Sequence, residues 1–171
     1  MSSIEPLSRI PVGVVVERRK AKSAWADFVW RPIAVLAGEP DAAPWTTLDV
    51  DADRMTYYAG SAEIALYRSD CSSYRDNLAT EAPKLWAVLR ATGAEPPLAV
   101  VTVTADPSEG EALTTSGTDL IEALPMPAPI RAAIAVFIAG HQVDDARFVK
   151  RERERADPEA LARRAPIKGR P

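Results

Sequence analysis

The chain has few of the side chains that most often carry out catalysis or hold transition metals. Among its 171 residues there is one histidine, His141, and one cysteine, Cys71. A lone cysteine excludes an internal disulfide, and these two residues cannot supply the set of His and Cys ligands that a zinc site needs. A redox metal cluster within one chain is excluded for the same reason. We therefore expect no cofactor.

Glycine-rich catalytic and phosphate-binding motifs are also missing. Neither G-x-x-x-x-G-K-[ST] nor G-x-G-x-x-G occurs, and no G-x-S-x-G sequence is present to expose a nucleophilic serine. Asp49, Asp51 and Asp53 begin like a calcium-binding loop. However, Arg54 stands where that loop needs glycine, and Gly60 stands where it needs glutamate. We interpret this stretch as a solvated acidic loop, and the inventory favours a protein that is not an enzyme.

Long apolar runs are absent as well. A membrane-spanning helix needs about 20 consecutive apolar residues, and no stretch of the chain approaches that length. The opening sequence, MSSIEPLSRI, lacks the basic and then apolar layout of a secretory signal. Together with the lone cysteine, these features predict a cytoplasmic protein without membrane contact.

Charge is distributed unevenly along the chain. The net charge is −3, but residues 147–171 carry nine Lys and Arg against four Asp and Glu, a local charge of +5 that leaves −8 on the rest. Nucleic acid is one candidate partner for this basic tail, but the acids interrupt the run and no aromatic side chain follows Phe148 to stack on bases. A protein partner is therefore favoured. The tail residues expected to carry the interaction are Lys150, Arg151, Arg153 and Arg155.

Two apolar runs near the start predict a pair of antiparallel strands. In the first, β-branched side chains recur at positions 10, 12, 14 and 16, which is the period of a half-buried strand. The second, Phe28 to Leu36, is apolar on both parities, so we expect it to be covered on both faces. Later strands should assemble around this pair.

The whole pattern predicts one α+β domain over residues 10–146, after a loose leader at 1–9 and before the tail at 147–171. Its sheet is expected to be mainly antiparallel, barrel-like or sandwich-like, with one short mid-chain helix and an apolar C-terminal helix. Further strands are expected at 45–48, 54–58, 61–68, 85–91 and 98–105, with a turn at Ala59 and Gly60. Helical segments are expected at 69–82 with a serine cap, at one turn from Asp119 to Glu122, and at 130–139 with Gly140 as its end.

Arginine and tryptophan gather around the first pair of strands. If the two runs pair, Arg18, Arg19 and Arg31 come together, with Trp25 and Trp30 nearby. Forked guanidinium donors beside aromatic faces can hold a phosphate, a carboxylate or an acidic segment of a partner. The alternative is that the arginines solubilise the strand ends and the tryptophans fill the core.

Several segments resemble a bacterial domain family of unknown function, over about residues 10–164. They are IPVGVVVERRK at 10–20, the W-x-x-x-x-W-R-P of 25–32, YRDNL at 74–78, LWAVLR at 85–90, PMP at 125–127 and FVKRERERADPEALARR at 148–164. Members of that family are typically encoded near molybdenum-dependent formate dehydrogenase genes and their maturation factors. The resemblance implies an accessory or assembly role, and it brings no catalytic residue with it.

Three functions follow from these patterns. The leading one is a non-catalytic accessory protein that binds another protein; by the resemblance, that partner is a molybdoenzyme or one of its maturation factors. The second is a protein or enzyme that binds a small anionic ligand at the arginine and tryptophan residues. The third is a nucleic-acid-binding module that acts through the tail.

Overall fold

The first strand, β1 (Ser8–Lys20), lies inside a four-stranded antiparallel sheet. The structure is a computed structural model that describes residues 4–25 and 27–155, without the side chains of residues 142–155. Across the sheet the order is β2 (Phe28–Ala37), β1, β4 (Arg54–Leu66) and β3 (Thr46–Val50). The valines at positions 12, 14 and 16 of β1 are completely buried, and each stabilises the fold by roughly 1.5–3 kcal/mol. The predicted antiparallel pair of β1 and β2 is confirmed.

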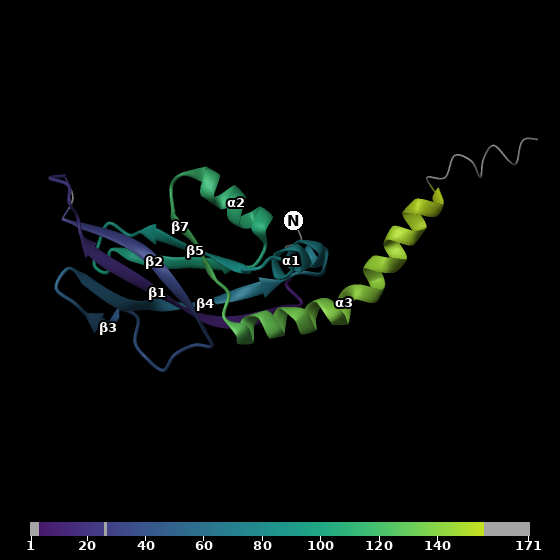
Figure 1. Cartoon of the computed structure of the whole chain (residues 1–171), viewed down its shortest axis with the longest axis horizontal. Coiled ribbons are helices and arrows are strands. Elements are labelled where there is room, and N and C mark those ends of the chain that lie inside the picture. The colour runs from purple at the N-terminus through teal and green to yellow at the C-terminus, as the bar shows by residue number, and fades with distance from the viewer. Residues whose placement is uncertain (1–3, 26, 156–171) are drawn as a thin grey trace, which may run out of the picture.

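A second, three-stranded antiparallel sheet faces the first. Its central strand is β5 (Lys84–Ala91), flanked by β6 (Leu98–Thr104) and β7 (Leu120–Pro125). β4 lies beside β6 at one edge and β2 lies beside β7 at the other, but no ladder of hydrogen bonds joins the sheets there (Figure 1). The predicted α+β fold with antiparallel sheets is therefore confirmed in its sandwich-like form, with open sheets and not a closed barrel.

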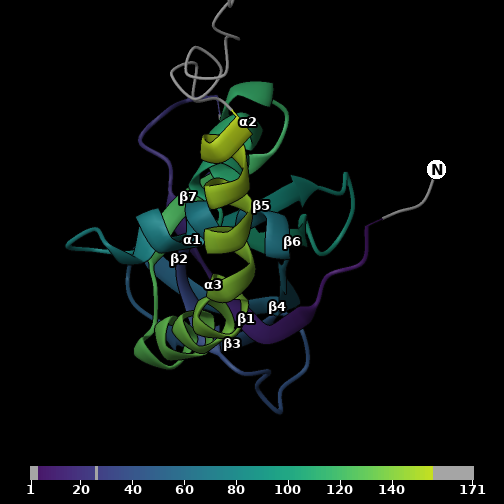
Figure 2. The same ribbon diagram turned by 90° about the vertical axis from the view of Figure 1, so that its right-hand side faces the viewer.

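Two helices cover the end of the sandwich at which β1 begins. A single 3-10 turn, η1 (Arg68–Asp70), leads into α1 (Cys71–Leu78), which packs beside α3 (Ala128–Arg155). The ring centroids of Tyr74 and Phe137 lie 6.3 Å apart across this contact. Figure 2 looks at this end and shows both helices in front of the strands. No helix in the described part of the chain is long and apolar enough to cross a membrane.

The segments predicted at 54–58 and 61–68 form one strand, β4, which ends at Leu66, so the predicted turn at Ala59 and Gly60 is wrong. Val14 of β1 pairs with Gly60 of β4 while Val15 pairs with Tyr58, which leaves Ala59 as the extra residue of a β-bulge. Gly60 has a φ of 144°, a backbone conformation that other residues rarely adopt. A glycine with a small neighbour is also typical of a turn, and this explains the error.

The stretch after β6 also differs from the prediction. Residues 107–116, where no helix or strand was predicted, form α2 (Pro107–Ser116), and the helical turn expected from Asp119 is replaced by β7. The carboxylate of Asp106 accepts a hydrogen bond from the Ser108 N–H at 2.9 Å and so caps α2. Gly117 ends the helix in the left-handed conformation, with a φ of 76°.

Three element boundaries and one burial pattern differ from expectation. β1 starts at Ser8, inside the expected leader, and the mid-chain helix is shorter than 69–82 and has no side-chain cap. α3 continues through Gly140 to Arg155, so residues 147–155 of the tail are helical and residues 156–171 lie outside the described part. β2 is not covered on both faces, because Phe28, Val29 and Arg31 are exposed. The apolar residues at the start of β2 therefore lie at the surface and not in the core.

Candidate binding groove

A groove opens at the end of the sandwich opposite α1 and α3, between the larger sheet and the β5–β6 connection. Its volume is about 320 Å³. Three strands of the larger sheet, β1, β2 and β4, contribute to it, together with Trp45 just before β3 and the connection between β5 and β6. We call it the aromatic groove, and its lining residues are Arg18, Phe28, Trp30, Trp45, Tyr57, Glu95, Pro96 and Pro97.

Three large rings form the floor of the aromatic groove and hold one another in place. The ring centroids of Trp30 and Trp45 lie 5.7 Å apart with an interplanar angle of 84°, an edge-to-face contact. Tyr57 lies 5.9 Å from Trp30 and 5.8 Å from Trp45. Aromatic pairs at such distances are worth roughly 0.5–1.5 kcal/mol each beyond the area they bury. The floor is therefore a preformed apolar surface.

Arg18 lies between these rings and Phe28. Its guanidinium carbon is 4.2 Å from the Phe28 ring centroid and 5.8 Å from those of Trp30 and Tyr57. One guanidinium N–H donates to the Met55 sulfur at 2.9 Å, and a thioether is a weak acceptor. Among the residues described, no carboxylate lies within ion-pairing distance of Arg18. Within the described part of the chain, the contacts of this cation are therefore with ring faces and a sulfur atom.

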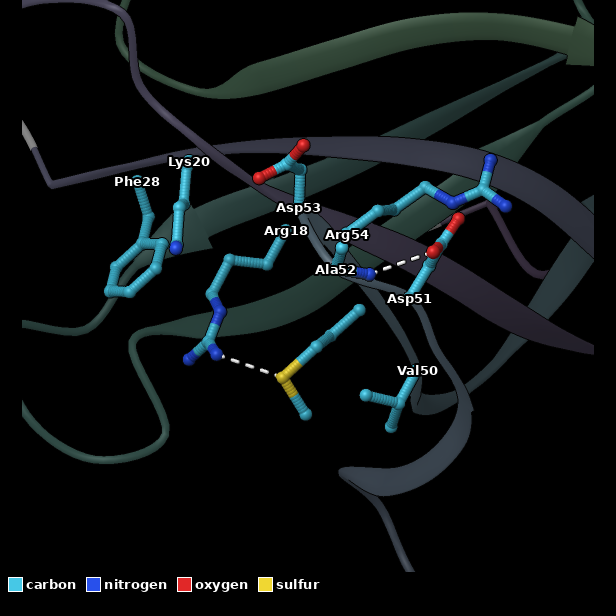
Figure 3. Close-up of a pocket in the computed structure, with 9 residues that line it drawn as sticks. Arg18, Lys20, Phe28, Val50, Asp51, Ala52, Asp53 and Arg54 are labelled. Carbon is cyan, nitrogen blue, oxygen red and sulfur yellow. Dashed lines mark hydrogen bonds between the residues drawn. The ribbon is translucent and has the colours of Figure 1, made fainter.

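A second hollow lies on the other side of Arg18 and Phe28, beneath the β3–β4 connection. Its volume is about 240 Å³. Figure 3 shows Lys20, Asp51 and Asp53 around it, with the dashed line from Arg18 ending on the sulfur of Met55. Because both cationic and anionic side chains line this hollow, its charge is mixed. We call it the loop hollow.

The structure separates the three arginines that the sequence analysis grouped together. Successive residues of a strand point to opposite faces, so Arg18 faces the aromatic groove while Arg19 lies on the other face and hydrogen-bonds to Glu17. Arg31 is exposed and lies across from Glu17 in the β1–β2 register. The expected cluster of three arginines is therefore not formed. Of the proposed site residues whose side chains the structure describes, only Arg18 and Trp30 come together in the groove.

The other proposed site residues lie elsewhere. Trp25 stands on the β1–β2 connection with 96% of its surface exposed, so it fills no core. The tail residues fall in the last part of α3, where side chains lie outside the described part of the structure. These tail residues are Lys150, Arg151, Arg153 and Arg155.

Sequence reasoning missed most of the groove. Phe28, Trp45 and Tyr57 were assigned to strands or their approaches, but nothing local indicated that they meet. The sequence did hold one signal: Met55 and Tyr57 are two residues apart in a predicted strand, so their side chains point to the same face. Their position beside Arg18 depends on the register between β1 and β4, in which Arg18 lies opposite Met55.

The lone histidine and cysteine both lie at the helical end and not in the aromatic groove. The His141 ring stacks on Phe137 at 4.3 Å, and its Nδ1 is 2.7 Å from the Phe137 carbonyl oxygen. Cys71 is buried at the first position of α1. Within the described ranges, no three His, Cys, Asp or Glu side chains are grouped closely enough to hold a metal ion. The groove's chemistry is therefore that of rings, one guanidinium and one nearby carboxylate, Glu95.

Comparison with known proteins places the chain in a family. No curated protein and no solved structure matches it. One family profile does match, that of a protein of unknown function (DUF3305), and the match covers residues 11–153. This span includes every described strand except the first residues of β1, both sides of the aromatic groove and almost all of α3. The chain therefore belongs to the DUF3305 family.

Proposed function

We propose that this chain is a non-catalytic accessory protein that binds another protein through the aromatic groove and the exposed side chains beside it. The observation that carries the proposal is the groove itself. There the rings of Trp30, Trp45 and Tyr57 lie beside the Arg18 guanidinium, which has no carboxylate partner among the residues that the structure describes. Tryptophan, tyrosine and arginine are the residues most enriched among the energetic centres of protein interfaces. A rigid aromatic floor also loses little conformational entropy on binding.

Exposed apolar side chains beside the groove support the proposal. Trp25 and Val29 are 96% and 56% exposed, and Phe28, which lines the groove, is 41% exposed. Leu48 and Val50 of the edge strand β3 are 51% and 64% exposed. Such side chains gathered at one end of a domain are typical of a surface that a partner covers. We call these five residues the apolar rim.

The family resemblance supports a partner class. Members of the family that the sequence resembles are typically encoded near molybdenum-dependent formate dehydrogenase genes. We therefore propose that the partner is that enzyme or one of its maturation factors. In this proposal the chain assists assembly by holding a segment of the partner. The basic residues near the end of α3 add a second, electrostatic contact.

Affinity isolation from the native cells tests the proposal. Tagged full-length chain should recover a specific partner, and the double variant Trp25→Ala, Phe28→Ala should recover at least about tenfold less, because interface anchors typically cost more than 1 kcal/mol each when truncated. Val136→Ala is the matched control, since Val136 is 73% exposed on α3 at the far end of the molecule. Equal recovery by the rim variant and the control would contradict the proposal.

A further inference from the structure

We propose that the aromatic groove recognises a carboxylate: Arg18 pairs with an acidic side chain of an extended partner segment, whose adjacent aromatic ring packs on Trp30 and Trp45. This inference rests on the proposed function, because it names the chemistry of the segment that the groove holds. It assigns Arg18 as the residue that sets specificity and the three rings as the residues that supply affinity.

The first step is the unmet hydrogen-bonding capacity of Arg18. A guanidinium has five N–H donors, and one of those on Arg18 reaches only the sulfur of Met55. Arg90 provides a comparison within the chain. Two of its N–H groups donate to the two carboxylate oxygens of Asp119, at 2.9 Å each. Arg18 is partly buried and lacks such a partner among the residues described. A carboxylate from a binding partner would supply an acceptor for the remaining N–H donors of Arg18.

The second step is that the guanidinium is already held in place. Arg18 lies directly across from Trp30 on β2 and from Met55 on β4, so both neighbouring strands fix its position. The Phe28 ring, 4.2 Å from the guanidinium carbon, lies against the guanidinium. A planar fork fixed in this way binds a carboxylate with less loss of side-chain freedom than a mobile surface arginine.

The third step is the size and lining of the groove. A volume of about 320 Å³ lies at the low end of the roughly 300–1,000 Å³ range of small-molecule sites. Such a space suits one or two side chains of a peptide better than a whole cofactor. Pro96 and Pro97 add further apolar surface to the lining. The combination of one cation with apolar walls matches an acidic residue beside an aromatic one.

Among the described residues that line the groove, Glu95 is the one carboxylate, and it does not pair with Arg18. Its charge opposes an incoming acid. We therefore expect the Glu95→Gln variant to keep the preference for an acidic segment and to bind it at least as tightly as the natural chain does. This variant serves as a charge control, because it alters a lining residue without touching the guanidinium.

The experiment is a nuclear magnetic resonance titration of full-length, isotope-labelled protein with two blocked peptides. One is acetyl-Ala-Phe-Glu-Ala-amide and the other replaces Glu by Gln. We expect the indole N–H signals of Trp30 and Trp45 to shift and the Glu peptide to bind about tenfold more tightly, as a charge-assisted hydrogen bond contributes. Arg18→Gln should abolish the tenfold difference. Arg18→Lys, which keeps the charge and loses the fork, should restore only part of it.

The outcomes separate this inference from the proposed function. Equal binding of the two peptides, or no shift of Trp30 and Trp45 with either, would overturn the inference. Tighter binding of N-acetyl-phenylalanine, a small free acid, than of the Glu peptide would overturn it in favour of a small-molecule site. Arg18→Gln should also reduce recovery of the native partner. Full recovery by a folded Arg18→Gln chain, with loss in the Trp25 and Phe28 variant, would overturn the inference and leave the proposed function standing.

Discussion

Asn77 of α1 and Lys84 of β5 exchange two hydrogen bonds as if they were neighbours in a sheet. The Lys84 N–H donates to the Asn77 side-chain oxygen at 3.0 Å, and the Asn77 amide donates to the Lys84 carbonyl at 2.8 Å. The same amide donates to the Ala105 carbonyl at 2.9 Å. From its buried position, Asn77 therefore ties α1 to the start of β5 and to the residue that follows β6.

Replacing Asn77 by alanine should destabilise the fold strongly. The change leaves three backbone groups without their partner, and each unsatisfied buried group costs about 1–3 kcal/mol before water enters. We expect a loss of about 2–4 kcal/mol in the free energy of unfolding, measured by urea denaturation. Asp76→Ala, at an exposed position of the same helix, should change it by less than about 0.5 kcal/mol. A loss at Asn77 as small as the control's would show that these bonds do not stabilise the fold.

Adding a methyl group to Gly110 should also destabilise the fold. A Cβ atom at this position of α2 would lie 2.4 Å from ring atoms of Trp86, so the helix or the ring must shift. Overpacking of this kind costs typically about 1–3 kcal/mol, which exceeds the gain of about 1 kcal/mol that alanine brings to a helix. Thermal unfolding should show a lower Tm for Gly110→Ala.

Making the same substitution in a chain that lacks the Trp86 ring tests whether the steric clash causes this loss of stability. In a Trp86→Ala chain the clash is absent, so Gly110→Ala should become neutral or stabilising there. Glu111→Ala, exposed on the same helix, should change neither background. The same destabilisation by Gly110→Ala with and without the Trp86 ring would rule out the steric explanation.

The ion pair between Arg90 and Asp119 predicts a pH dependence. The Arg90 guanidinium donates two hydrogen bonds to Asp119 and holds the pKa of that carboxyl below its ordinary value of 3.8. A group whose pKa is lowered by folding stabilises the native state above its unfolded pKa, and this contribution disappears as the pH falls through the folded pKa. The Asp119→Asn chain should therefore be less stable than the natural chain at pH 7. This gap in the free energy of unfolding should disappear in acid.

Unfolding curves of both chains between neutral and acid pH measure this gap. Salt should narrow it at pH 7, because Arg90 is largely exposed and its interaction is screened. Asp41→Asn, which makes the same substitution at an exposed loop position, is the matched control. A gap of constant size at every pH would contradict an ion pair as its origin.

The parts of the fold that the sequence predicted are those with a local signal. Alternating valines at positions 12, 14 and 16 predict β1 because burial of one face repeats every second residue. The hairpin of β5 and β6 follows from two such runs separated by Gly93 and two prolines. The bulge at Ala59 escaped prediction because its residues also suit a turn, and only pairing with β1 decides between the two.

The groove escaped prediction for a related reason. Arg18 and Trp30 were proposed as site residues from their nearness in the first strand pair, and they do meet. Trp45 and Tyr57 join them only because β4 returns beside β1 and β3 pairs with β4. Arg19 was grouped with Arg18 although adjacent residues of a strand face opposite ways. Register between distant strands is the information that a single sequence lacks.

Hydrogen exchange on the isolated chain and on its complex with the recovered partner is the most direct test of groove binding. Amides of the β1–β2 connection, β3 and the β5–β6 connection should exchange more slowly in the complex, because a partner seated in the aromatic groove and on the apolar rim covers all three. Exchange in α1 should stay unchanged. Protection confined to α1 and α3, with the groove exchanging as in the free chain, would contradict binding at the groove.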